Sequence, residues 1–281
     1  MSISVPQEGL THSPSFRGAD PEDDWRAAEP SRSRATEWAI LVWVVALVAA
    51  VGASLAQQPT DVGLTAYNEG KYATAFAVWK QKASEGSADA EYNLGALYDL
   101  GHGVAQDRVE AAKWYRMSAD QGKAQAEYNL GLLYEWGRGV PRDYSEAARW
   151  YRKAADQGDA QAQCNLGYLF MSGQGVEWNY AEAAKWSRKA ADQGVAVAEY
   201  NVGLMYQRGL GVPHDSAEAM KWLVKAAMHG HARSSIYLGD LYFSGAGVIK
   251  DNSEALRWYR KAAQQGSPLA QLRMAAFDKK A

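Results

Sequence analysis

The sequence predicts an all-α protein: an α-solenoid of about six helical hairpins plus a C-terminal capping helix, preceded by a single transmembrane helix. A Leu-Gly or Val-Gly pair recurs every 36 residues from Leu94-Gly95 to Leu238-Gly239. Each interval holds two stretches with apolar residues at helical spacing. Ahead of the repeats, residues 38–56 carry no charged side chain. A period of this length is typical of stacked helical repeats.

The transmembrane helix is expected over residues 37–57. The 19 uncharged residues from Trp38 to Ala56 reach across a bilayer core of roughly 30 Å at about 1.5 Å per residue. Arg26, Arg32 and Arg34 lie just before them, and no Lys or Arg follows until Lys71. The positive-inside rule therefore predicts a signal anchor with a cytoplasmic N-terminus and a periplasmic or otherwise extracytoplasmic repeat domain.

The segment before the anchor, residues 1–36, is rich in Pro and Ser and has an acidic cluster, so we expect a disordered cytoplasmic tail. A cleaved signal peptide is the alternative to the anchor, because small residues stand at Ser54 and Ala56. The apolar run exceeds the usual ~7–15 residues of a signal peptide, which favours the anchor. Secretion after cleavage near Ala56 remains the alternative.

The first helix of each repeat is illustrated by residues 126–136, where Ala126, Leu130 and Tyr134 share one face. Glycine inside a helix costs about 1 kcal/mol relative to alanine, yet every copy keeps one in this helix. We infer that a second helix packs too closely at this position for a side chain. The glycines are Gly95, Gly131, Gly167, Gly203 and Gly239.

The second helix carries an apolar stripe, for example Ala147, Trp150, Tyr151 and Ala154. An Asp or Asn stands at its start with Glu three residues later, a capping-box spacing that can satisfy the free N–H groups of the first turn. A glycine follows its end, where a helix C-terminus favours a positive φ. The capping residues are Asp107, Asp143, Asn179, Asp215 and Asp251.

These residues together form the pattern A-x-A-x-Y-N-L-G-x-L-Y-x-x-G-x-G-V-x-x-D-x-x-E-A-A-x-W-Y-x-x-A-A-D-Q-G, which resembles the Sel1-like repeat, a relative of the tetratricopeptide repeat. The resemblance implies an α-solenoid over residues 58–281, with the first helices lining a concave face and the second helices on the convex face. Its units are a degenerate 61–87, five full units at 88–123, 124–159, 160–195, 196–231 and 232–267, and a cap at 268–281.

Composition and motifs give little support for catalysis, metal binding or nucleic-acid binding. The 30 basic and 32 acidic residues give a net charge of −2, which provides no attraction to nucleic acid. The single cysteine, Cys164, occupies a slot held by Tyr92 and Tyr128 in other units and is interpreted as an apolar filler. His229 and His231 are the only close histidine pair. We therefore expect no catalytic residue, no metal and no cofactor.

The second helices also carry a ridge of Lys and Arg side chains, which could hold anionic glycans or lipid headgroups. A glutamate precedes Lys113 and its equivalents by three residues and neutralises part of this charge. A solvated surface is the favoured interpretation.

The positions where the repeats differ share one face of the first helix. If Ala88, Ala124 and their equivalents are counted as slot one, these positions are slots two, five, nine, twelve and thirteen. In tetratricopeptide-like solenoids this face is the ligand groove, and its mixture of aromatic and charged residues suits a protein or peptide partner. The tyrosines of slot five could instead pack between adjacent helices. The predicted partner-binding residues are Tyr128, Trp136, Met171, Tyr200, Arg208 and Phe243.

We therefore expect a non-enzymatic protein–protein interaction scaffold or adaptor, anchored in the membrane, that binds a partner in its concave groove. An exported hydrolase or glycan-binding protein built on the same solenoid is the alternative. A hydrolase would need converging titratable groups, whereas Asp99, Glu135 and Asp240 lie in different units without a partner histidine.

Overall fold

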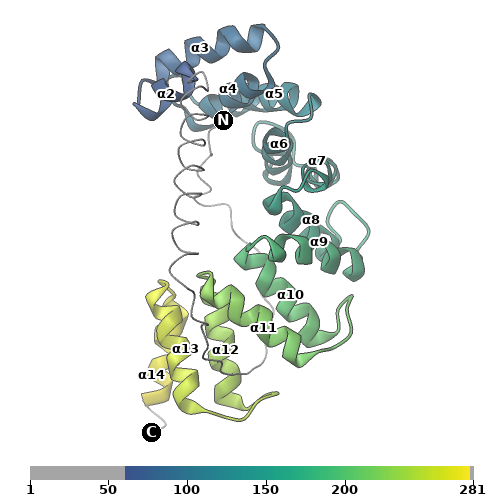
Figure 1. Ribbon diagram of the computed structural model, residues 1–281, viewed down its shortest axis with the longest axis vertical. Coiled ribbons are helices and arrows are strands. Elements are labelled where there is room, and N and C mark those ends of the chain that lie inside the picture. The colour runs from purple at the N-terminus through teal and green to yellow at the C-terminus, as the bar shows by residue number, and fades with distance from the viewer. Residues whose placement is uncertain (1–60, 279–281) are drawn as a thin grey trace, which may run out of the picture.

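The computed structural model describes residues 61–278 as a curved stack of helices, with α2 and α3 at one end and α12 to α14 at the other (Figure 1). The described residues contain helices and no strand, which confirms the all-α solenoid. The predicted tail 1–36 and anchor 37–57 lie outside these residues. The helices are α2 (Val62–Asn68), α3 (Tyr72–Ser84), α4 (Ala88–Leu100), α5 (Arg108–Asp120), α6 (Ala124–Trp136), α7 (Tyr144–Asp156), α8 (Ala160–Ser172), α9 (Tyr180–Asp192), α10 (Ala196–Arg208), α11 (Ser216–Met228), α12 (Ala232–Ser244), α13 (Asn252–Gln264) and α14 (Pro268–Asp278).

The helices pair into six hairpins followed by α14 alone. In each hairpin the even-numbered helix comes first and is called helix A, and the odd-numbered helix is helix B. Each helix packs mainly on the helices next to it in the chain, as expected for a solenoid. Among the described helices, none combines the length and apolar character that crossing a membrane requires.

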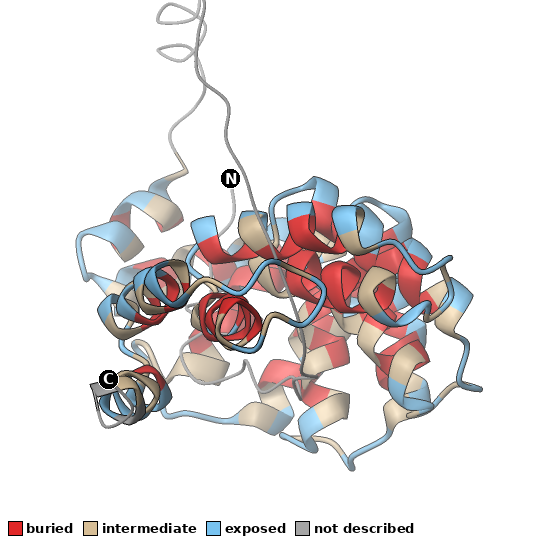
Figure 2. Ribbon diagram, turned by 90° about the horizontal axis from the view of Figure 1, so that it is seen from below, coloured by how far each residue is buried: buried red, intermediate tan, exposed pale blue. Residues whose placement is uncertain are grey.

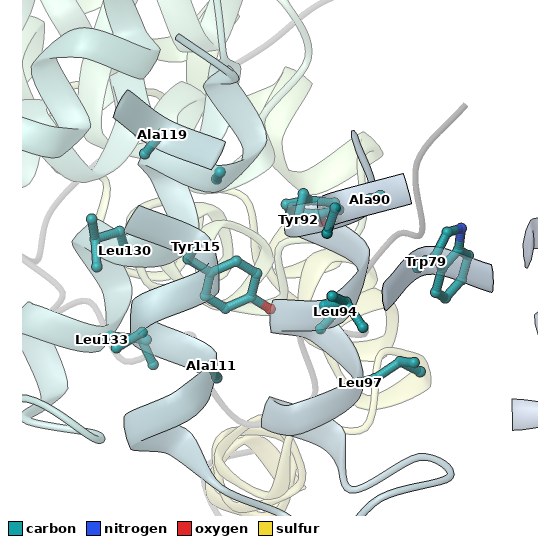
Figure 3. Packing of buried hydrophobic residues seen from close by; sticks show 14 of the residues in the cluster. Trp79, Ala90, Tyr92, Leu94, Leu97, Ala111, Tyr115, Ala119, Leu130 and Leu133 are labelled. Carbon is teal, nitrogen blue, oxygen red and sulfur yellow. The ribbon is translucent and has the colours of Figure 1, made fainter. Parts of the chain in front are cut away.

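Within each hairpin the two helices lie close together at the glycine of helix A. A Cβ on Gly131 would lie 2.6 Å from Tyr151 Cδ1, closer than real Cβ atoms approach a neighbour. The same site is faced by Tyr115, Ser187, Leu223 or Tyr259 in the other full units, and in the first hairpin Gly63 faces Trp79. Figure 3 shows the Tyr115 ring directed from α5 towards α4. The inference of a close helix contact is confirmed.

In the five full units each helix B begins at the predicted capping residue. Asp143 Oδ1 accepts hydrogen bonds from the N–H groups of Ser145 at 2.8 Å and Glu146 at 3.1 Å. In a capping box the Glu side chain would accept a hydrogen bond from the N–H of the capping residue. Here the Asp143 N–H donates instead to the Tyr134 carbonyl of helix A at 2.9 Å. Glu146 instead accepts from Trp150 Nε1 at 3.2 Å. The cap therefore joins the two helices as well as starting one.

Neighbouring hairpins are joined by the loop between helices A and B. A Cβ on Gly139, whose φ is +74°, would lie 2.0 Å from the Arg108 carbonyl oxygen, so this loop lies directly on the start of the preceding helix B. Gly103, Gly175 and Gly211 make the same approach in their units. The second glycine of the loop is thus required by contact between repeats.

An arginine on helix B also joins successive hairpins, in a contact that we call the Arg–Trp clamp. The Arg116 guanidinium lies 5.3 Å from the Trp150 ring centroid and donates to Tyr134 Oη. The next clamps are Arg152 on Phe170 and Trp186, and Arg188 on Tyr206 and Trp222. Part of the basic ridge is therefore stacked on aromatic rings, a contact worth about 0.5–1 kcal/mol at exposed sites.

The buried side chains form successive clusters along the stack, each with residues from neighbouring hairpins. Leu94, Leu130, Leu166 and Leu238 of the repeated slot are fully buried. Figure 2 shows buried segments where helices face one another and exposed segments in the loops. A hairpin therefore depends on its neighbours to cover its apolar surface.

Replacing Gly131 with alanine should destabilise the protein although alanine is the better helix former. The overpacking against Tyr151 costs about 1–3 kcal/mol, which exceeds the gain of about 1 kcal/mol in helix propensity. Urea unfolding followed by circular dichroism measures the difference. Gln125→Ala, an exposed change in the same helix, should leave the midpoint nearly unchanged, and a raised midpoint for Gly131→Ala would contradict the close contact.

Candidate partner-binding surface

The six predicted partner-binding residues all lie on helices A. Tyr128 and Trp136 are on α6, Met171 is on α8, Tyr200 and Arg208 are on α10, and Phe243 is on α12. The structure places them in three different environments.

Tyr128 and Tyr200 belong to the core, with only 8% and 3% of their surfaces exposed. The Tyr128 ring centroid lies 5.8 Å from that of Tyr151 on the paired helix. The Tyr200 ring lies 4.7 Å from His231, at the start of the next hairpin. The alternative that slot-five tyrosines pack between helices therefore describes both residues, and neither offers much contact area to a partner.

Phe243 is half-buried and supports the capping helix. Its ring centroid lies 4.9 Å from that of Phe277 on α14, and Lys250 Nζ lies 5.6 Å from the Phe243 centroid. Its truncation would therefore disturb the end of the solenoid as well as any bound partner.

Trp136, Met171 and Arg208 remain at the surface. Trp136 ends α6 with 38% of its surface exposed, and the Arg138 guanidinium lies 5.9 Å from its ring. Met171 is half-buried near the end of α8, and Arg208 is exposed at the last position of α10. These residues come from three successive hairpins, at equivalent or adjacent slots of helix A.

The acids considered for the hydrolase alternative have structural partners. Asp99 forms an ion pair with Arg108 Nε at 3.1 Å, and Asp240 accepts from Tyr259 Oη at 2.8 Å and from Arg273 Nη2 at 3.0 Å. Burial raises the pKa of Glu135, while a hydrogen bond from the Tyr151 hydroxyl opposes that shift. Each acid thus contributes to packing within its own region.

The thiol and imidazole groups are also used structurally. Cys164 is buried, and burial raises the pKa of its thiol to about 12, so the thiol is protonated at neutral pH and is a poor nucleophile. His229 Nδ1 lies 2.8 Å from Oε2 of the buried Glu199. Within residues 61–278 no group of His, Cys, Asp or Glu side chains could hold a metal ion.

The Glu199–His229 contact is one member of a repeated hydrogen bond that the sequence analysis missed. In the first two full units, Gln121 Nε2 donates to Glu91 Oε2 and Gln157 Nε2 to Glu127 Oε2, both at 2.7 Å. The third unit has Gln193 donating to Gln163 Oε1 at 2.9 Å. The sequence carries a signal for this hydrogen bond: a polar residue stands in slot four of helix A, such as Glu91, and a second polar residue follows 30 positions later, such as Gln121.

The paired 13-residue helices stack through contacts between neighbours and present variable residues on helix A. This arrangement defines a helical-repeat protein of the tetratricopeptide-like class. The Sel1 repeat family model matches residues 88–123, 124–159, 160–195, 196–231 and 232–267. These matches cover more than half of the chain, and the chain belongs to the Sel1 repeat family.

Solved structures agree with this assignment. A Sel1 repeat protein from Oxalobacter formigenes is 36% identical with a TM-score of 0.71, over 75% of this chain and 86% of that one. A protective antigen of uropathogenic Escherichia coli is 33% identical with a TM-score of 0.58, over 78% of this chain and 56% of that one. No curated protein matches this chain. Sel1 repeat proteins are generally non-enzymatic protein-interaction scaffolds.

The buried carboxyl of Glu127 should make stability depend on pH. Burial raises its pKa, although the charge of Lys153 and the hydrogen bond from Gln157 oppose the shift. A raised folded-state pKa means that the carboxyl's contribution is complete below its unfolded pKa and is lost as pH rises through the folded value. Glu127→Gln, which copies Gln163, should therefore raise the urea midpoint at pH 7 and lose this advantage in acid.

Glu182→Gln is the matched control of opposite sign. The hydrogen bond from Lys185 is the main cause that lowers the pKa of Glu182, so the contribution of this carboxylate is present above its unfolded pKa and is lost as pH falls through the folded value. Its replacement should lower the midpoint at pH 7. A lower urea midpoint for Glu127→Gln at pH 7 would contradict the inference that burying the charged Glu127 carboxylate destabilises the protein.

Proposed function

We propose that this chain is a non-enzymatic scaffold that binds a partner protein or peptide along a concave face formed by helices A. The observation that carries the proposal is Trp136, a large aromatic side chain left at the surface. Its slot holds Leu100, Ser172, Arg208 and Ser244 in the other full units. The fold therefore does not require an aromatic residue at this position.

The surface residues of the neighbouring hairpins support the same interpretation. Met171 and Arg208 accompany Trp136 on helices A of the second to fourth full units. Trp, Met and Arg are enriched in protein interfaces, and Trp and Arg are common among the residues that dominate binding energy. Tyr128 and Tyr200 support this surface from the core, and Phe243 fixes its C-terminal end against α14.

The hydrolase alternative has weaker support. Asp99, Glu135 and Asp240 each have a partner in the fold, and the Cys164 thiol is buried. A glycan-binding role for the basic ridge is also weakened, because Arg116 and Arg152 stack on aromatic rings of the next hairpin. The partner-binding proposal uses side chains that lie at the surface of helices A.

Trp136→Ala should weaken partner binding by about 2 kcal/mol or more, as expected for an interface hot spot, and should leave the melting temperature nearly unchanged. Partners are first identified by crosslinking and mass spectrometry on intact cells, and affinities are then measured with the purified partner. Trp178→Ala is the matched control, because Trp178 is 63% exposed but lies in the α8–α9 loop.

Two outcomes would refute this surface. One is unchanged affinity of every crosslinked partner for Trp136→Ala, and the other is an equal loss for Trp178→Ala. Trp150→Ala calibrates the stability measurement, because the loss of this buried ring should cost about 3–5 kcal/mol.

We propose further that residues 37–57 anchor the scaffold in a membrane, with the N-terminus in the cytoplasm and the repeats on the opposite side. The uncharged run and the arginines before it support this topology. A reporter fused after Ala281 should behave as exported, and a reporter fused before Trp38 as cytoplasmic. A C-terminal reporter that stays in the cytoplasm would overturn the topology.

A further inference from the structure

A pocket of about 290 Å³ lies between α9, α10 and the loop that follows α10. Its inner wall includes the buried side chains of Val202 and Met205, with Val212 contributed by the loop. The exposed cations Lys185 and Arg188 and the hydroxyl-bearing Tyr206 complete the lining. The pocket thus combines an apolar interior with positive charge at its solvent side, near the lower end of the volume range of small-molecule sites.

One residue of the pocket lining is smaller than its counterparts in the other full units. Val202 occupies the slot that holds Leu94, Leu130, Leu166 and Leu238 in the other full units. Val202 therefore has one carbon atom fewer than the leucines of the same slot.

The two cations remain able to meet an anion. Lys185 pairs with Glu182 at 2.8 Å and Arg188 with Asp192 at 3.1 Å, but 55% of the Lys185 side chain and 45% of the Arg188 side chain are exposed to water. Ion pairs between exposed side chains contribute at most about 1 kcal/mol, so an anion can compete for both cations. Arg188 Nη1 also lies 3.5 Å from Tyr206 Oη, and the Arg188 guanidinium is held 4.6 Å from the Trp222 ring. The guanidinium is therefore kept in place beside the pocket.

We propose that this pocket binds a small organic acid, with the apolar part against Val202 and Met205 and the carboxylate beside Arg188 and Lys185. An aliphatic carboxylic acid of medium length matches both the volume and the charge. The pocket is built from α9, α10 and a loop, whereas Trp136 lies on α6. The inference is therefore independent of the partner-binding surface.

The test is photolabelling of the full chain in its membrane with a diazirine derivative of octanoic acid, followed by peptide mapping by mass spectrometry. We expect saturable labelling on α9, α10 or the 209–212 loop. Octanoate should compete about tenfold better than octan-1-ol, because only the acid gains charge-assisted hydrogen bonds.

Val202→Leu should abolish the labelling, because it restores the side chain of the other units and fills the pocket. Leu at the equivalent position of four repeats makes this variant compatible with the fold. Arg188→Gln should reduce the advantage of octanoate over octan-1-ol, and Trp136→Ala should leave labelling unchanged. Absence of saturable labelling, undiminished labelling of Val202→Leu, or equal competition by the acid and the alcohol would each overturn the proposal.

Discussion

The close contact between the two helices of each hairpin is the constraint on which the rest of the structure depends. At Gly131 the α6 backbone lies so near Tyr151 that a Cβ would overlap its ring. This approach buries the apolar stripes of both helices against each other and against the next hairpin, leaving Leu130 and Ala154 with no exposed surface. Because every full unit keeps the glycine, the same geometry repeats and the hairpins stack along one curved path (Figure 1).

Stacking of equal units separates the residues that maintain the fold from those that vary at the surface. The glycines, the capping Asp residues and the Arg–Trp clamps are used between and within hairpins. The end of helix A is free to vary, and Trp136 and Arg208 occupy the same slot of different units. A solenoid can therefore change its partner without changing its packing, which is the physical basis of the proposed scaffold function.

The sequence predicted the parts of the structure that depend on local chemistry and periodicity. The glycine contact and the caps at Asp143 and its equivalents follow from residues that recur in every unit. The contacts of Tyr200 with His231 and of Phe243 with Phe277 depend on the angle between successive elements of the stack, which periodicity alone does not provide. For the same reason the sequence did not predict the contacts of Arg152 with Phe170 and Trp186, which lie 18 and 34 residues further along the chain.

Deletion of one whole repeat tests the nearest-neighbour account most directly. Removal of residues 124–159 would place α5 beside α8, where Arg116 would meet Phe170 and Trp186, the same contacts that Arg152 now makes. Circular dichroism and urea unfolding should then show a helical, cooperatively folded protein. Removal of residues 124–141, which takes α6 but leaves α7 without its paired helix, should abolish this cooperative transition. Equal loss of helicity in the two deletions would contradict the account.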